Sequence, residues 1–354
     1  MRSFGMIIIR KVLYCFSYLS WIFRYVKVIL GLNTVSDIKI LSIEFSSVCN
    51  LRCKYCFLDQ LDRARFLDIH IYEKLIKEVA ENPKYNIRIM EWPISGEFLV
   101  YPKWREVVDI TKKYMKENPN FRPHIILNEN FMLMDEEKLD YILNAGVLSQ
   151  IICSVDGHDA QSFENMRPPG KFPKIFKNIH LLYEKNKRLE KPVHIQINNG
   201  RDGQSIGKDF SEEMKKIFAK GDTITQWTPE YWNESFNKKN KEFYPAKGFC
   251  SFVFNNVTLS SSGKISKCCM DLRGQTQYAD LSKNSLADIW NSRIRRDFLS
   301  LMFSGKRSLI QGCASCSITR TNNDNRYNNP LRIIKRKMKF ISQKGKRYST
   351  SGNT

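Results

Sequence analysis

Three cysteines within eight residues are the most distinctive chemical feature of this 354-residue chain. Cys49, Cys53 and Cys56 form a C-x3-C-x2-C pattern, in which the thiolates lie close enough together to bind a soft metal centre. Three ligands leave one corner of a four-iron cube open, and an open corner can bind a small molecule. A structural zinc loop is the alternative, but zinc usually takes four ligands as two pairs. The pattern therefore favours an iron–sulfur cluster.

The cysteines directly follow an apolar run, residues 40–45, that predicts a β-strand, and Tyr55 lies immediately before the last cysteine. With this arrangement the chain resembles the radical S-adenosylmethionine (SAM) superfamily. The resemblance implies that the three cysteines hold a 4Fe-4S cluster whose fourth iron is chelated by SAM. It further implies reductive cleavage of SAM to a 5′-deoxyadenosyl radical, which abstracts hydrogen from a substrate. Tyr55 would lie against the adenine.

Further motifs similar to those of this family follow in the expected order. Ser95-Gly96-Glu97 resembles the G-G-E motif, whose backbone binds the amino group of the SAM methionine, although Ser95 replaces its first glycine. Asn128 stands where the family often has T-N-G, here without the glycine. The S-x-D-G sequence that begins at Ser154, with Arg167 further on, resembles a motif of the maturase-like subgroup. That match implies that Ser154 and Arg167 lie near the ribose and the carboxylate of the cofactor, and arginine suits a carboxylate.

A second cysteine set lies towards the C-terminus and comprises Cys250, Cys268, Cys313 and Cys316. The intervening sequence predicts a hairpin, with strands 251–259 and 264–267, and then a helix opened by Asn284 or Ser285. Hairpin, helix and a final C-x2-C resemble the SPASM/twitch extension of the family, which binds auxiliary clusters. Four cysteines imply one auxiliary 4Fe-4S cluster. A structural zinc site, or Cys269 in place of Cys268, remains an alternative.

Strand and helix patterns alternate about six times between these cysteine sets. The predicted strands after the first are 87–92, 124–127, 151–156, 193–198 and 222–227, and the predicted helices are 69–82, 104–117, 135–145, 173–186 and 211–219. Such alternation predicts an α/β fold with a parallel sheet, and the family resemblance implies a partial (β/α)6 barrel. We divide the chain into a basic amphipathic segment (1–37), a radical SAM core (38–244), a SPASM/twitch-like domain (245–318) and a basic, partly disordered tail (319–354).

The net charge of +21 is concentrated at the two ends of the chain, since residues 1–31 contribute +5 and residues 319–354 contribute +9. On a helix, the basic residues of the first segment form a narrow stripe on an otherwise apolar surface. This pattern fits either peripheral contact with an anionic membrane or packing on the core. The longest uncharged run, residues 12–23, is too short to span a bilayer. We expect a cytoplasmic protein, and no specific nucleic acid partner, because no RNA-binding module is evident.

The resemblance implies an enzyme that removes hydrogen from its substrate and passes an electron to the auxiliary cluster. We expect oxidation of a sugar, cyclitol or glycolipid-type carbon, because the spacing of the second cysteine set is most similar to that of one-auxiliary-cluster alcohol oxidases of the family. The partners expected are a small-molecule or glycan substrate and a reduced flavodoxin- or ferredoxin-type electron donor. Asp271, Glu230 and His158 are candidate general bases. A peptide-modifying maturase, an RNA-modifying enzyme and a non-catalytic metal-binding membrane adaptor are the alternative functions.

Overall fold

A nine-stranded sheet organises the part of the chain that the structure describes. The computed structural model describes residues 34–56, 65–227, 252–271 and 274–314, together with the single positions 23, 26, 27, 30, 32, 250 and 316. The strand order is β6-β5-β4-β3-β2-β1-β7-β8-β9. Much of the N-terminal basic segment, the C-terminal basic tail and the candidate base Glu230 lie outside the described residues.

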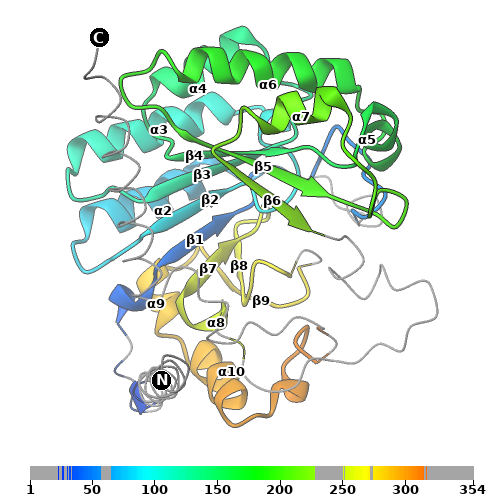
Figure 1. Cartoon of the computed structure of the whole chain (residues 1–354). Coiled ribbons are helices and arrows are strands. Elements are labelled where there is room, and N and C mark those ends of the chain that lie inside the picture. The colour runs from blue at the N-terminus through cyan, green and yellow to red at the C-terminus, as the bar shows by residue number, and fades with distance from the viewer. Residues whose placement is uncertain are drawn as a thin grey trace, which may run out of the picture.

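The first six strands run parallel and in sequence order, as six β/α repeats require. They are β1 (Ile40–Ile43), β2 (Ile89–Trp92), β3 (His124–Glu129), β4 (Gln150–Ser154), β5 (His194–Gly200) and β6 (Thr223–Trp227). The helices between them are α2 (Ile69–Glu81), α3 (Trp104–Glu117), α4 (Glu136–Asn144), α5 (Ala160–Met166), α6 (Phe172–Asn186) and α7 (Glu212–Phe218). Short 3-10 turns occur at η1 (Val35–Asp37) and η3 (Phe98–Val100). Figure 1 shows α3, α4, α6 and α7 along the outer face of the sheet.

The remaining strands extend this sheet from the other side of β1. β7 (Asn256–Leu259) pairs parallel with β1, and β8 (Lys264–Ser266) and β9 (Gln277–Asp280) follow antiparallel. α8 (Phe252–Asn255), α9 (Leu286–Trp290), α10 (Arg293–Phe303) and the 3-10 turn η6 (Arg307–Leu309) complete this part, below β7 in Figure 1. Within the described residues β6 and β9 each have one neighbour, so the barrel is open, which confirms the partial (β/α)6 prediction.

Two apolar cores hold the chain together. The large one lies between the barrel strands and their helices, where Phe45 makes edge contacts with Tyr72, Trp92 and Phe98. The start of the C-terminal part joins this core through Val257, Leu259, Ile265 and other residues. A separate small core surrounds Cys250 and includes Phe254, Phe298 and Met302. The second cysteine set is therefore supported by its own apolar packing.

Sequence patterns predicted most elements to within a few residues. One predicted strand is partly wrong and one helix was missed. The expected strand 251–259 is wrong in its first half, because α8 occupies Phe252–Asn255 and only β7 is extended. The sequence reading also missed α5, which a capping box between Asp159 and Ser162 opens. Ser285, and not Asn284, caps α9 by accepting a hydrogen bond from the backbone N–H of Asp288.

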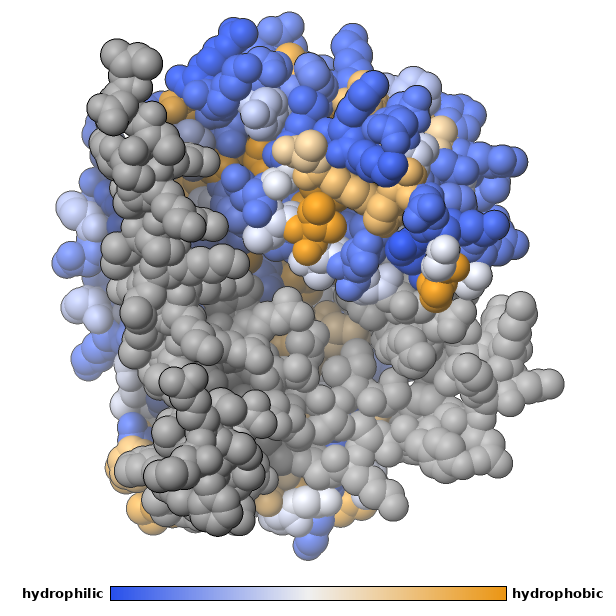
Figure 2. All heavy atoms as spheres, viewed as in Figure 1, coloured by the Kyte–Doolittle hydropathy of each residue, from blue (hydrophilic) through white to orange (hydrophobic). Residues whose placement is uncertain are grey.

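The described surface facing the viewer in Figure 2 is mainly hydrophilic, with small apolar groups interspersed. Ile224, on the edge strand β6, and Ile206, after β5, are among the exposed large apolar side chains. No described helix combines the length and the hydropathy that crossing a bilayer demands.

Candidate functional site

The first cysteine loop leaves the C-terminal end of β1 and lies against the C-terminal end of α5. The backbone N–H of Arg52 donates to the carbonyl of Pro168 at 2.5 Å, and that of Lys54 donates to the carbonyl of Met166 at 3.0 Å. The N–H of Cys56 returns to the carbonyl of Cys53 at 2.8 Å, which forms a turn between these two cysteines. The loop is thus fixed at the carboxyl edge of the sheet, where enzymes of the barrel type place their chemistry.

The three thiols of this loop share one electrostatic environment. The pKa of Cys49 is raised to about 12, chiefly by burial, next by the nearby carboxylate of Glu97, and to a smaller extent by the charges of Cys53 and Cys56. Burial also raises the pKa of Cys53, while the guanidinium of Arg167 opposes this shift. Among the described side chains, no three His, Cys, Asp or Glu residues converge on a single metal ion. Three thiols in one short loop can each bind one iron of a cluster.

A buried ionic network connects this loop to β4 and α5. The hydroxyl of Tyr55 donates to Oδ2 of Asp156 at 2.5 Å, and Nε of Arg167 donates to the same oxygen at 2.6 Å. The backbone N–H of Gly200, at the end of β5, donates to Oδ1 of Asp156 at 2.7 Å. Asp156 is 0% exposed. The Tyr55 ring also meets Trp227 edge-on at 5.1 Å. Tyr55, between Cys53 and Cys56, is therefore held by Asp156, which follows β4, and by Trp227 on β6.

The Ser95-Gly96-Glu97 turn packs directly on the start of the cysteine loop. The N–H of Glu97 donates to the carbonyl of Val48 at 3.0 Å. Gly96 has φ +70°, and a Cβ there would lie 1.9 Å from the carbonyl oxygen of Ser46. Only glycine tolerates both the left-handed backbone and this close approach. The turn and the cysteine loop consequently form one unit.

Two buried carboxyls meet behind this turn. Burial raises the pKa of Glu97. Burial, and next the negative charge of Glu97, raise the pKa of Glu129 well above its ordinary value. Oε1 of Glu97 is buried and receives no hydrogen bond from the part of the chain that the structure describes. The G-G-E resemblance assigns the amino group of SAM to the backbone of this turn, and a buried carboxyl oxygen without a donor next to that backbone is a further acceptor suited to an ammonium group. On this observation the residues present fit SAM.

The structure places Asn130, and not Asn128, beside the cysteines. Nδ2 of Asn128 donates to the carbonyl of Pro93 at 3.2 Å, so this side chain supports the backbone just before Ser95. Nδ2 of Asn130 donates to Oδ1 of Asn50 at 2.9 Å and lies 3.7 Å from Sγ of Cys49. Phe131 follows with φ +62°, a conformation typical of glycine. Residues 129–131 therefore suit the T-N-G position better than residues 127–129, in which Asn128 is the central residue. A cofactor role of Asn128 stays a prediction.

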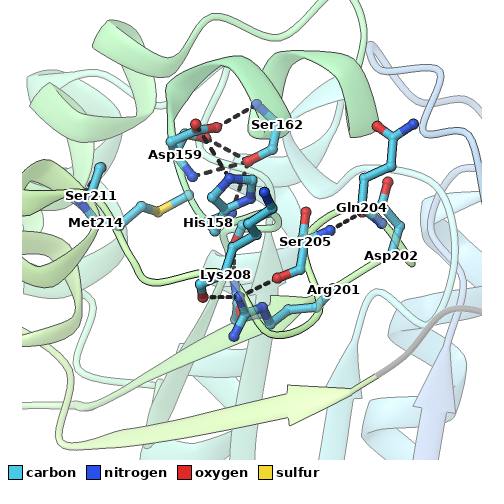
Figure 3. Close-up of polar contacts among 12 residues, drawn as sticks. His158, Asp159, Ser162, Arg201, Asp202, Gln204, Ser205, Lys208, Ser211 and Met214 are labelled. Carbon is cyan, nitrogen blue, oxygen red and sulfur yellow. Dashed lines mark hydrogen bonds and ion pairs between the residues drawn. The ribbon is translucent and has the colours of Figure 1, made fainter.

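The remaining predicted positions lie on two loops at the same edge of the sheet. Ser154 ends β4, two residues before Asp156. His158 follows, and Figure 3 shows its ring among residues of the segment 201–208, which continues from β5. Nε2 of His158 lies 3.4 Å from Asp159, and its buried Nδ1 has no partner among the described residues. The other described candidate base, Asp271, accepts hydrogen bonds from Gln275 and Thr276, which form its own turn. A catalytic role for either residue stays a prediction.

The charges of the other three cysteines of the second set act on Cys313. Burial raises the pKa of Cys313 to about 11, and the charges of Cys268, Cys250 and Cys316 add to this effect. Arg307 is buried beside them; its Nε donates to the carbonyl of Cys313 at 3.3 Å and its Nη2 to that of Cys316 at 3.5 Å. Cys250 precedes α8, Cys268 follows β8, and Cys313 and Cys316 follow η6. Four thiols of this kind fit one auxiliary cluster with a protein ligand for every iron.

Comparison with protein families agrees with both cysteine sites. Residues 43–199 match the model of the radical SAM superfamily, and residues 250–317 match the SPASM iron–sulfur cluster-binding domain. The chain belongs to the radical SAM superfamily and carries a SPASM domain. Its cofactors are accordingly SAM, the SAM-binding 4Fe-4S cluster and an auxiliary iron–sulfur cluster. The superfamily prediction is therefore confirmed, while the individual ligands remain assignments from sequence and geometry.

Particular relatives cover different shares of the chain. GTP 3′,8-cyclase of Chlorobaculum tepidum is 30% identical over 141 residues, which are 40% of this chain and 39% of that protein. The chain thus spans well under half of this curated relative. BtrN in complex with AdoMet and 2-DOIA has a TM-score of 0.53 at 14% identity, covering 82% of this chain and 98% of its own. Native anSMEcpe with bound AdoMet has a TM-score of 0.55 at 16% identity, and the match covers 78% of this chain and 88% of that chain. Streptococcus suis SuiB bound to S-adenosylmethionine has a TM-score of 0.51 at 12% identity, and the match covers 83% of this chain and 76% of that chain. At these identities the similarity to the solved structures shows the fold.

Several residues of the site were missed as candidates from the sequence. Asp156 is part of the S-x-D-G sequence, but the sequence does not show that it binds Tyr55 and Arg167. Glu129 and Asn130 directly follow Asn128 in the sequence. The positive φ of Phe131 is the feature that matches Glu129, Asn130 and Phe131 to the T-N-G motif. Arg307 carries no sequence signal beyond its nearness to the last two cysteines.

Proposed function

We propose that this chain is a radical SAM oxidoreductase that oxidises a carbinol or similar carbon of a sugar, cyclitol or glycolipid-type substrate. The observation that carries the proposal is that Cys250, Cys268 and Cys316 are all near enough to Cys313 for their charges to raise its pKa. Four protein thiolates fill every iron of a four-iron cluster, which leaves no open position for substrate. Electron acceptance is then the role that this cluster can perform.

The residues of the first site divide the tasks of holding the cofactors. Cys49, Cys53 and Cys56 hold the first cluster, and the Ser95-Gly96-Glu97 turn receives the amino group of SAM. The Asp156–Arg167 pair fixes Tyr55 between two of the iron ligands and places a positive charge near Cys53. When bound, the cluster and SAM supply a 5′-deoxyadenosyl radical. Net oxidation then requires that the substrate carbon lose one hydrogen atom to that radical, one proton to a base and one electron to the auxiliary cluster.

The partners follow from this chemistry. The proposal requires a reduced flavodoxin- or ferredoxin-type donor for the first cluster and a small-molecule or glycan substrate. His158 and Asp271 remain candidate bases. A cytoplasmic location and peripheral contact of the N-terminal segment with anionic membrane are part of the same proposal, since the basic stripe on residues 1–31 fits a lipid surface.

The test separates the two clusters. In Cys313→Ala protein prepared without oxygen, we expect SAM cleavage to continue with substrate present, while the two-electron oxidised product is lost. Substrate deuterated at the reacting carbon should transfer deuterium into 5′-deoxyadenosine in both proteins. About eight irons per wild-type chain support two clusters. About four irons together with one zinc, or full product formation by Cys313→Ala, would refute the auxiliary cluster's proposed role.

A peptide-modifying activity is the second candidate. Streptococcus suis SuiB bound to precursor peptide SuiA shares this fold, with a TM-score of 0.51 at 14% identity and coverage of 85% of this chain. A peptide that stimulates 5′-deoxyadenosine formation and itself loses two mass units would favour this function. Stimulation by sugars or cyclitols, with none by peptides, would favour the first proposal.

A further inference from the structure

Glu44 is a buried carboxylate that lies between the two halves of the site. It follows β1 directly, is 2% exposed, and precedes the first cysteine by five positions. Its Oε1 accepts a hydrogen bond from the hydroxyl of Ser95. Its Oε2 accepts two further bonds at 2.8 Å, from the backbone N–H and from the hydroxyl of Ser261. A buried carboxylate needs such donors, because burying an unsatisfied charge is costly.

The donors to the two oxygens belong to different functional units. Ser95 begins the turn to which we assign the amino group of SAM, and its hydroxyl exists only because serine replaces the family's first glycine. Ser261 lies in the turn between β7 and β8, the hairpin whose second strand leads to the auxiliary ligand Cys268. Glu44 thus contacts the cofactor turn with one oxygen and the auxiliary hairpin with the other.

The turn between β7 and β8 is held rigidly against the barrel, so a shift of the Glu44 carboxylate is transmitted to this turn. The N–H of Glu44 donates to the carbonyl of Leu259 at 2.9 Å, in continuation of the β1–β7 pairing. A Cβ on Gly263 would lie 2.6 Å from Cδ1 of Ile71 on α2, which shows how closely the turn packs. Figure 1 shows β7 directly beside β1, with β8 on the other side of β7.

We propose that Glu44 is a positioning residue that couples occupation of the SAM site to the auxiliary-cluster hairpin through Ser95 and Ser261. This inference rests on the proposed role of the Ser95-Gly96-Glu97 turn in binding SAM. Binding at the turn fixes Ser95, and Ser95 fixes the carboxylate that holds Ser261. Since coupling between two sites is reciprocal, removal of the Ser261 hydroxyl weakens SAM binding although Ser261 lies outside the SAM site.

The experiment measures SAM affinity by calorimetry on anaerobic protein with both clusters loaded. Ser261→Ala is expected to weaken SAM binding at least fivefold. Ser262→Ala is the matched control, because its hydroxyl lies in the same turn but bonds to Ser260 and Gln277, and it should bind SAM within twofold of wild type. The effects of Ser95→Ala and Ser261→Ala should be non-additive in the double variant. Unchanged affinity in Ser261→Ala, or equal losses in both hairpin variants, overturns the coupling.

A second measurement avoids dependence on variants that fold poorly. In wild-type protein, SAM should slow amide hydrogen exchange of residues 256–266, and in Ser95→Gly protein it should not. Identical exchange in the hairpin with and without SAM overturns the inference. Gly96→Ala, which disturbs the backbone of the turn, separates this failure from failure of the proposed turn: if that variant binds SAM as tightly as wild type, the turn does not bind the amino group, and the coupling is refuted with it.

Discussion

Replacing Asp156 by asparagine should lower the free energy of unfolding by more than the loss of any single hydrogen bond on the surface. Asp156 accepts bonds from Tyr55, Arg167 and Gly200 and is 0% exposed. An amide in its place leaves the buried guanidinium of Arg167 without a charge partner, and breaking a buried ion pair in this way costs about 3–5 kcal/mol. Tyr55→Phe leaves the ion pair intact and removes one bond to a charged acceptor, which is worth about 1.5–3 kcal/mol.

The assay is urea unfolding of the cluster-free protein under reducing conditions, followed by far-ultraviolet circular dichroism. Tyr141→Phe provides the matched control, because its hydroxyl donates to Asp109 at 2.7 Å and Asp109 is exposed. We expect this variant to lose about 1 kcal/mol or less. In parallel, iron retained after anaerobic purification is counted, since Tyr55 lies between two proposed iron ligands.

The expected order of destabilisation is Asp156→Asn, then Tyr55→Phe, then Tyr141→Phe. Both variants of the network should also retain less iron than wild type. If Asp156→Asn unfolds at the same urea concentration as Tyr141→Phe and keeps its full iron content, the network neither stabilises the barrel nor positions the cysteine loop.

Three further changes test other parts of the site. Gly96→Ala should weaken SAM binding more than tenfold, measured by calorimetry, because the added Cβ would lie 1.9 Å from the Ser46 carbonyl oxygen. Gly146→Ala is the control, because Gly146 has a similar φ and a Cβ there would meet no atom within 4 Å, so SAM affinity should be unchanged. Equal SAM affinities of the two variants would contradict crowding at Gly96 as the cause. Folded Glu129 holds a proton that the unfolded chain releases above a pKa of about 4.3, so its contribution to stability decreases as pH rises from that value towards the raised folded pKa. Glu129→Gln should therefore gain stability over wild type as pH rises from about 5 to about 8, which unfolding at each pH would show; a constant difference would refute the raised pKa. Lysine lacks the planar guanidinium with which Arg307 donates to two carbonyls, so Arg307→Lys should lower bound iron from about eight to about four per chain. Full iron content would show that Arg307 does not support the second cysteine set.

The sequence predicted the barrel well because each element carries its own pattern. Helix α3 begins and ends at the predicted residues 104 and 117, since its apolar residues recur with helical spacing. The start of the hairpin was predicted less well. Residues 252–255 are apolar and aromatic, a composition that suits a strand, but they form α8 and pack into the small core beside Cys250. Tertiary packing there overrode local preference.

The candidate site shows the same division between local and distant information. The spacing of Cys49, Cys53 and Cys56 is local, so these thiols could be proposed as ligands from the sequence alone. The contacts of Asp156 with Tyr55, 101 positions away, and of Glu44 with Ser261, 217 positions away, depend on how the strands are ordered in the sheet. Asn128 was selected by its place in the sequence, whereas the backbone turn at Phe131 identifies Asn130 as the residue beside Cys49.

The most direct test of the central claim is the formation of 5′-deoxyadenosine. Protein prepared without oxygen, with its clusters intact, is mixed with SAM and dithionite, and the product is quantified by mass spectrometry. We predict that wild type forms 5′-deoxyadenosine and that Cys53→Ala forms none. Absence of the product from wild type with intact clusters, or equal amounts from Cys53→Ala, would contradict cleavage of SAM at the Cys49, Cys53 and Cys56 site.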